Sequence, residues 1–96
     1  MDYVSDTDVK KYLAKSTKDK DLIDKLVLLG NKIHTSELVL GVMLTRYKEF
    51  LELGLTKDEA LKSTFKIDLF SNPNAKLKDT IERKELIKAI FKISVD

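Results

Sequence analysis

The chain contains no cysteine and no tryptophan, and its 96 residues include one histidine, one proline and three glycines. Without cysteine, the protein has no disulfide bond, no thiolate metal ligand and no cysteine nucleophile. Hairpins and sheets use glycine and proline to turn, so their scarcity disfavours a strand-rich fold. Helices joined by short loops fit this composition better.

Long hydrophobic runs are also missing. The longest apolar stretch, residues 38–44, includes a glycine and falls far short of the roughly 20 residues needed to span a bilayer. The first residues lack the basic start and apolar run of a secretory signal. We therefore expect no membrane partner and a cytoplasmic location in a bacterial-type cell.

What is present is a balanced mixture of apolar and charged residues, 43% and 35% of the chain. This content is too apolar for a disordered chain and suits amphipathic helices with charged outer faces. The length predicts a single domain over residues 1–96 with one core. The 18 basic and 16 acidic residues leave a net charge of +2, which is too small to indicate a nucleic-acid partner by itself.

Apolar spacing and capping residues predict an all-α fold, a compact bundle of about five short helices. Ser5, with Val4 before it, is typical of an N-cap, so the first helix should begin near Asp6. Its inward residues should be Val9, Tyr12 and Leu13. Residues 16–17 can cap the second helix, and Gly30 followed by Asn31 should end it. The second helix should bury Leu22, Ile23, Leu26, Val27 and Leu29.

The third helix, capped by Thr35 or Ser36 and ended by Gly54, is apolar nearly all round in its first half. Such a helix is predicted to be enclosed by the others, with Gly41 allowing a close contact between helices. We expect Leu40, Leu44 and Tyr47 to lie in the core.

Thr56 and Glu59 have the spacing of a capping box, so the fourth helix should begin there. Residues 66–70 alternate like a strand but have no partner strand, so a frayed helix end or an extended loop is expected. Residues 71–74 are predicted to form a loop. Asp79 and Glu82 indicate the cap of a fifth helix. Its apolar residues are Ile81, Leu86, Ile87, Ile90, Phe91 and Ile93.

The residues that could carry chemistry have structural interpretations. Asp19, Asp21 and Asp24 resemble the start of a calcium loop, but the glycine and glutamate that such a loop requires are missing. We interpret these aspartates as a helix N-terminus, and His34 as a structural or solvated residue near a helix end. The carboxylate pairs at positions 49 and 52 and at positions 82 and 85 should be helix surface. We therefore expect no enzymatic activity, no catalytic residue, no cofactor and no metal.

The Leu-Gly-Leu-Thr turn at residues 53–56 resembles the turn of a helix-turn-helix over about a dozen residues. Phe50 stands where that motif normally has a small residue. The helix that would read DNA begins with Asp58 and Glu59, which would face a phosphate-lined groove. A small DNA-binding regulator is therefore the alternative function and not the leading one.

The leading hypothesis is a small non-catalytic protein-binding module, that is, an adaptor, inhibitor or regulatory subunit of a larger partner. Lysine- and isoleucine-rich small proteins are common in AT-rich bacteria and their phages, so a phage or mobile-element host-takeover or anti-defence factor is one such role. A third hypothesis is a structural or assembly subunit that self-associates through apolar residues outside its core.

A lysine-rich C-terminal surface is the candidate partner-binding site. Lys84, Lys88 and Lys92 recur every four residues, and Lys76 and Lys78 precede them. At about 100° per residue the first three form one stripe. The stripe should lie opposite the apolar arc of Leu86, Ile87, Ile90 and Ile93. This surface could attract an acidic protein surface or a nucleic-acid backbone.

Overall fold

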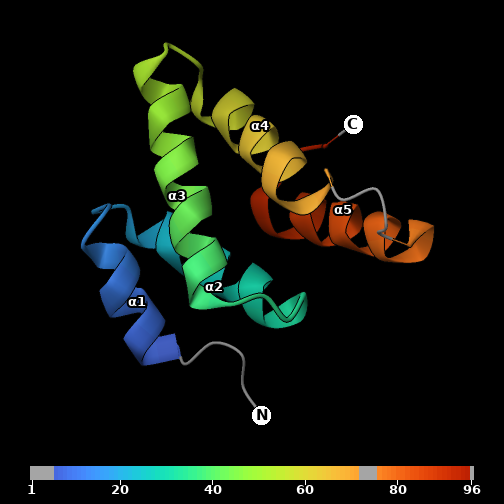
Figure 1. Ribbon diagram of the computed structural model, residues 1–96, viewed down its shortest axis with the longest axis horizontal. Helices are drawn as coiled ribbons and strands as arrows, with labels where there is room; N and C mark the ends of the chain where they lie inside the picture. Colours follow the sequence, from blue (N-terminus) through green and yellow to red (C-terminus); the bar gives the residue numbers. More distant parts are fainter. Residues whose placement is uncertain (1–5, 72–75, 96) are drawn as a thin grey trace. The chain divides into compact units, whose positions relative to one another are not determined.

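The computed structural model describes residues 6–71 and 76–95, and within these ranges it contains five α-helices and no strand (Figure 1). The helices are α1 (Asp6–Ala14), α2 (Lys20–Lys32), α3 (Glu37–Glu52), α4 (Lys57–Leu69) and α5 (Leu77–Phe91). The prediction of an all-α fold with about five helices is confirmed. None of the described helices is long and apolar enough to cross a bilayer.

Contacts divide the chain into two compact units, Met1–Thr45 and Arg46–Asp96. The first unit holds α1, α2 and the first half of α3, and the second holds the end of α3 together with α4 and α5. The single domain over residues 1–96 stays a prediction.

The caps of the first two helices differ from the predicted ones. α1 begins at Asp6 as expected, whereas the predicted cap Ser5 and its neighbour Val4 lie outside the described residues. α2 is capped by Asp19, whose carboxylate accepts a hydrogen bond from the Leu22 backbone N–H at 3.1 Å. Residues 16–17 therefore do not cap α2. An aspartate at this position satisfies a free N–H and also places a negative charge at the positive end of the helix.

α2 ends later than predicted, because Gly30 is used for packing and not for termination. The helix continues to Lys32, and a Cβ built on the buried Gly30 would lie 2.9 Å from Leu40 Cδ1. His34 takes the left-handed conformation instead, with φ of 55°. The backbone N–H of Thr35 then donates to the Gly30 carbonyl at 2.9 Å, as in a Schellman motif. This gives His34 a structural place at a helix end.

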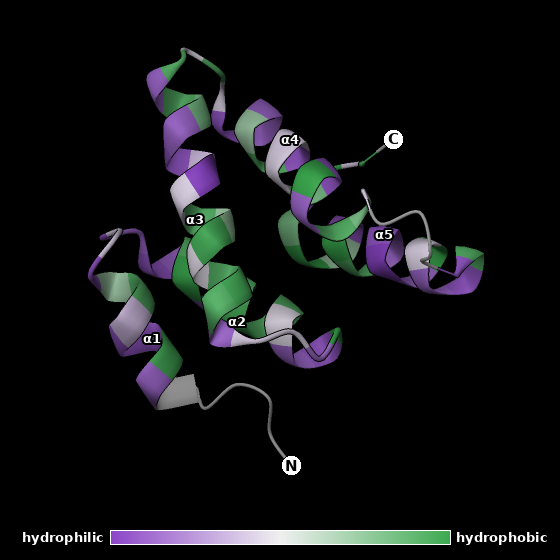
Figure 2. Cartoon of the chain, in the orientation of Figure 1, coloured by the Kyte–Doolittle hydropathy of each residue, from purple (hydrophilic) through white to green (hydrophobic). Residues whose placement is uncertain are grey.

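The first half of α3 is strongly apolar (Figure 2), but its side chains are not all covered. Leu40, Leu44 and Tyr47 are buried, which confirms the predicted core positions. Leu38 and Val42 are 68% and 52% exposed, so the prediction that α3 is enclosed on all sides is wrong. One side of α3 packs against its neighbours, and the opposite side also carries apolar residues but has no neighbour among the described residues to cover them.

The N-terminal turn of α3 and the close contact at Gly41 follow the prediction, but Tyr12 of α1, predicted to face inward, is 40% exposed. The Ser36 hydroxyl accepts a hydrogen bond from the Val39 backbone N–H at 3.4 Å, so Ser36 is the capping residue of the two candidates. A Cβ built on Gly41 would lie 2.6 Å from the Tyr12 hydroxyl oxygen. Gly41 therefore allows Tyr12 of α1 to lie directly on the α3 backbone.

Hydrogen bonds between residues close in the sequence define both ends of the α3–α4 turn. Gly54 has φ of +98°, and the Leu55 backbone N–H donates to the Phe50 carbonyl at 3.2 Å, which ends α3. The Thr56 hydroxyl accepts from the Glu59 backbone N–H, and a Glu59 carboxylate oxygen accepts from the Thr56 backbone N–H, both at 3.2 Å. The predicted capping box is confirmed.

α4 continues to Leu69, so the expectation of a frayed end or loop over residues 66–70 is wrong. Phe65 and Leu69 are four residues apart and both buried, which places them on one packed side of a helix. The Phe65 ring meets the Phe91 ring edge-on, with centroids 5.1 Å apart. These contacts join α4 and α5 within the second unit.

Candidate functional site

α5 carries the lysines predicted to contact a partner, and its start differs from the predicted one. The helix begins at Leu77, and Lys76 is its N-cap residue without a side-chain cap hydrogen bond. Asp79 lies in the first turn, so the prediction that Asp79 and Glu82 cap the helix is wrong. An acid in the first turn is favoured by the helix dipole without being the cap, which explains the misleading pattern.

The five predicted lysines occupy different environments. Lys76 and Lys78 are exposed, and the Lys78 ammonium lies 3.9 Å from a Glu82 carboxylate oxygen. Lys88 is exposed, whereas Lys84 is half-buried with its ammonium 5.7 Å from the centre of the Phe70 ring. Lys84 therefore makes a cation–π contact within its own unit and is only partly available to a partner.

Lys92 does not continue the helical stripe predicted with Lys84 and Lys88. It is the C-cap residue of α5 and takes the left-handed conformation, with φ of 61°. Its backbone N–H donates to the Lys88 carbonyl at 3.0 Å. Ile93 and Val95 are both buried, so the chain after α5 packs against the unit and does not extend the helix.

Two apolar residues share the outward side of α5 with the lysines. Leu77 is 74% exposed and Ile81 is 49% exposed, so these apolar residues of the fifth helix do not lie in the core. At about 100° per residue, these two positions lie within about 60° of Lys84 and Lys88 on the helix. We name Leu77, Ile81, Lys84 and Lys88 the α5 outer face. The four-residue spacing of Leu77 and Ile81, which continues the lysine stripe, is a sequence signal that could have identified it.

The aspartates near the start of α2 serve the helix and ion pairs. Asp19 is the N-cap, Asp21 lies 3.0 Å from the Lys25 ammonium, and Asp24 lies 3.2 Å from the Lys10 ammonium. In the part of the chain that the structure describes, no three acidic or histidine side chains are grouped so that they could hold a metal ion.

The start of α4, the helix that would read DNA in the helix-turn-helix resemblance, carries two acidic residues. Asp58 and Glu59 are exposed there, and hydrogen bonds from the Thr56 side chain and backbone lower the pKa of Glu59. Both arginines of the chain have partners in the second unit. Arg46 Nε donates to an Asp68 carboxylate oxygen at 3.0 Å, and Arg83 donates to the Leu69 carbonyl at 3.3 Å. Neither arginine lies on α4, whose exposed cations are Lys57 and Lys66.

No protein-family model matches this chain, and neither a curated protein nor a solved structure was found to be similar to it.

Proposed function

We propose that this protein is a non-catalytic binding module that acts on a larger protein as an adaptor, inhibitor or regulatory subunit. The observation that carries the proposal is the α5 outer face, where Leu77 and Ile81 are exposed beside Lys84 and Lys88. Exposed apolar side chains rimmed by charge mark interaction sites, because their burial against a partner is favourable.

The composition of this face indicates the chemistry of the partner. Apolar side chains can anchor in a pocket of the partner, and the lysines favour an acidic rim around that pocket. Lys76 and Lys78 are exposed near the same end of α5 and add positive charge. The proposed partner is a protein with an acidic surface in the cytoplasm of a bacterial-type cell, and host takeover or anti-defence by a phage or mobile element is the proposed setting.

The test is a pull-down from source cells with three forms of the protein, followed by mass spectrometry. The parent chain is compared with a lysine variant, Lys84→Glu, Lys88→Glu and Lys92→Glu together, and with an apolar variant, Leu77→Ser and Ile81→Ser together. We expect one protein to be retained by the parent and lost from both variants. The affinity of the purified partner is then measured for each form.

A matched control changes three exposed lysines outside α5, Lys15, Lys18 and Lys57, to glutamate. It makes the same change in net charge as the lysine variant, so it separates a specific contact from general electrostatic attraction. The proposal is overturned if the folded α5 variants bind the partner as tightly as the parent at low salt. Binding of DNA that falls steeply between low and moderate salt would support the DNA-binding alternative instead.

Self-association is a second candidate function, favoured by the exposure of Leu38 and Val42 on α3. These residues are four apart and therefore share one side of the helix. Sedimentation velocity at several concentrations tests it. A concentration-dependent dimer that Leu38→Ser and Val42→Ser together abolish would support it, and a monomer at every concentration would exclude it.

A further inference from the structure

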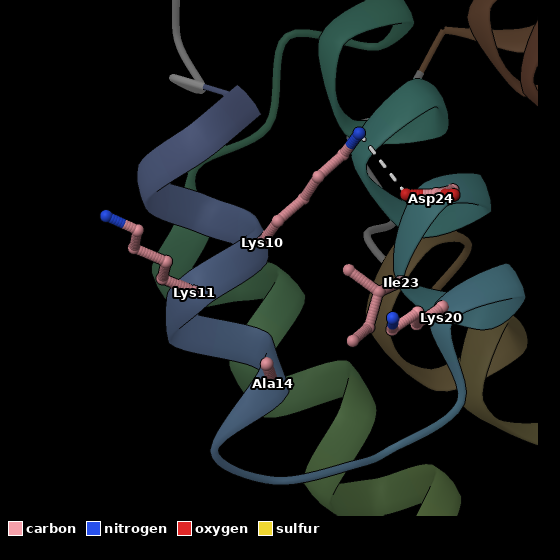
Figure 3. A pocket seen from close by; sticks show the side chains of 6 residues that line it. All are labelled: Lys10, Lys11, Ala14, Lys20, Ile23 and Asp24. Carbon is pink, nitrogen blue, oxygen red and sulfur yellow. Dashed lines mark ion pairs between the residues drawn. The ribbon is translucent and has the colours of Figure 1, made fainter.

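A shallow groove of about 300 Å³ lies between α1 and α2, within the first unit (Figure 3). Its lining residues are Lys10, Lys11, Ala14, Lys20, Ile23 and Asp24. The exposed Ala14 supplies an apolar floor beside the buried Ile23. The lysine stems extend this floor, because their methylene groups pack like hydrocarbon while the ammonium groups reach water. The volume is at the lower end of the range for small-molecule sites.

Charge is distributed unequally along the groove. At one end the Lys10 ammonium reaches from α1 to Asp24 of α2 and lies 3.2 Å from its carboxylate (Figure 3). Lys20 lies on the first turn of α2, one turn before Asp24, and makes no ion pair with any described residue. Figure 3 shows the Lys11 side chain directed away from α2. Lys20 is therefore the cation available to a new anion at the end of the groove that holds no carboxylate.

We infer that this groove binds a small amphiphilic carboxylate, that is, an alkyl chain or ring with one anionic head. The head pairs with Lys20, and the apolar body covers Ile23 and Ala14. The opposite orientation is disfavoured, because the Lys10 ammonium at that end is already paired with Asp24. A cationic amphiphile is disfavoured at the Lys20 end because like charges repel, and a fully polar anion does not use the apolar floor.

The affinity should be modest because the groove is open to solvent. A ligand of about a dozen non-hydrogen atoms at ordinary ligand efficiency binds with a Kd on the order of 1 mM. Decanoate has this size and chemistry, so we choose it as the probe, with decanol and decylammonium as the neutral and cationic counterparts.

The experiment is a titration of the ¹⁵N-labelled full chain with sodium decanoate, followed by amide NMR shifts. We expect saturable shifts at Ala14 and Ile23, weaker shifts with decanol and none that saturate with decylammonium. Lys20→Glu should raise the Kd at least about fivefold, because an ion pair is replaced by repulsion. Ala14→Leu, which fills part of the floor, should also weaken binding.

Lys18→Glu is the matched control, since Lys18 is exposed, lies close to Lys20 in the chain and does not line the groove. It should bind decanoate as the parent does. Lys20→Glu should remain folded, because an acid in the first turn of a helix is favourable. The inference is overturned by decanoate shifts that do not saturate or that map to α5. Equal binding to the parent and Lys20→Glu, or equal binding of decylammonium, also overturns it.

Discussion

α4 and α5 lie in the same unit and have similar lengths, 13 and 15 residues, but they are held in different ways. α4 begins in a reciprocal capping box and buries residues along its whole length, from Ala60 to Leu69. α5 begins at Lys76 without a side-chain cap, and its buried residues, Ile87 and Phe91, lie in its second half. α4 is therefore packed along its length, whereas none of the residues in the first two turns of α5 is buried.

The largest expected effect is the removal of the ring that joins the two helices. Phe65 is fully buried and contacts Phe91 edge-on. Phe65→Ala should lower the free energy of unfolding by about 3 to 5 kcal/mol, because it leaves a cavity in the unit. Urea denaturation followed by circular dichroism measures it. Ile67→Ala, at an exposed position of the same helix, should cost less than about 1 kcal/mol, and an equal loss in both variants would contradict the assignment of the core.

Two isoleucines test whether only one side of α5 packs. Ile87 is fully buried, so Ile87→Ala should lower the free energy of unfolding by about 2 to 5 kcal/mol. Ile81→Ala should cost less than about 1 kcal/mol, because about half of that side chain is already in water. The same denaturation measurement compares them. A larger loss at Ile81 than at Ile87 would mean that the α5 outer face belongs to the core.

Substitutions at the helix caps should change the free energy of unfolding less, and the two substitutions should act in opposite directions. Thr56→Ala removes the side-chain acceptor of the capping box and should destabilise the protein by about 1 kcal/mol. Lys76→Ser adds an acceptor where α5 has none and should stabilise it by up to about 1 kcal/mol. Thermal unfolding of both variants measures the signs. Destabilisation by Lys76→Ser would show that the start of α5 is held by something other than its own cap.

The smallest effect is the pH dependence of the α4 cap. Hydrogen bonds from the Thr56 side chain, and then from its backbone, lower the pKa of Glu59 below its usual value of 4.5. A lowered pKa in the folded state stabilises the protein at pH values above 4.5, and this contribution is lost as the pH falls through the folded-state pKa. NMR titration of the Glu59 carboxyl should show the low pKa, and Thr56→Ala should raise it. A usual pKa in the parent protein would show that the box is not closed in solution.

The difference between α4 and α5 also explains which predictions succeeded. The start of α4 was predicted correctly because the capping-box hydrogen bonds join residues only three positions apart, so the short sequence Thr56-x-x-Glu59 contains both partners. The cap predicted at Asp79 was wrong because an acid in a first turn is favourable at several positions.

The lysines of the candidate site could be identified from sequence, but their surroundings could not. Lys84 meets the ring of Phe70, a residue at the end of another helix, and helical periodicity does not predict a contact between residues so far apart in the sequence. α5 has two apolar stripes with the same helical period, the exposed Leu77 with Ile81 and the buried Ile87 with Phe91. Periodicity alone does not say which stripe faces the core.

The all-α class, the start of α4 and the end of α3 at Gly54 could be predicted from the sequence, because they depend on composition and on hydrogen bonds within one helical turn. Other features depend on contacts between helices. Gly30 lies inside α2 because Leu40 packs against it, and His34 takes the left-handed conformation that ends the helix. Leu38 is exposed while Leu40 is buried, since the position of neighbouring helices selects which side of an apolar helix is removed from water.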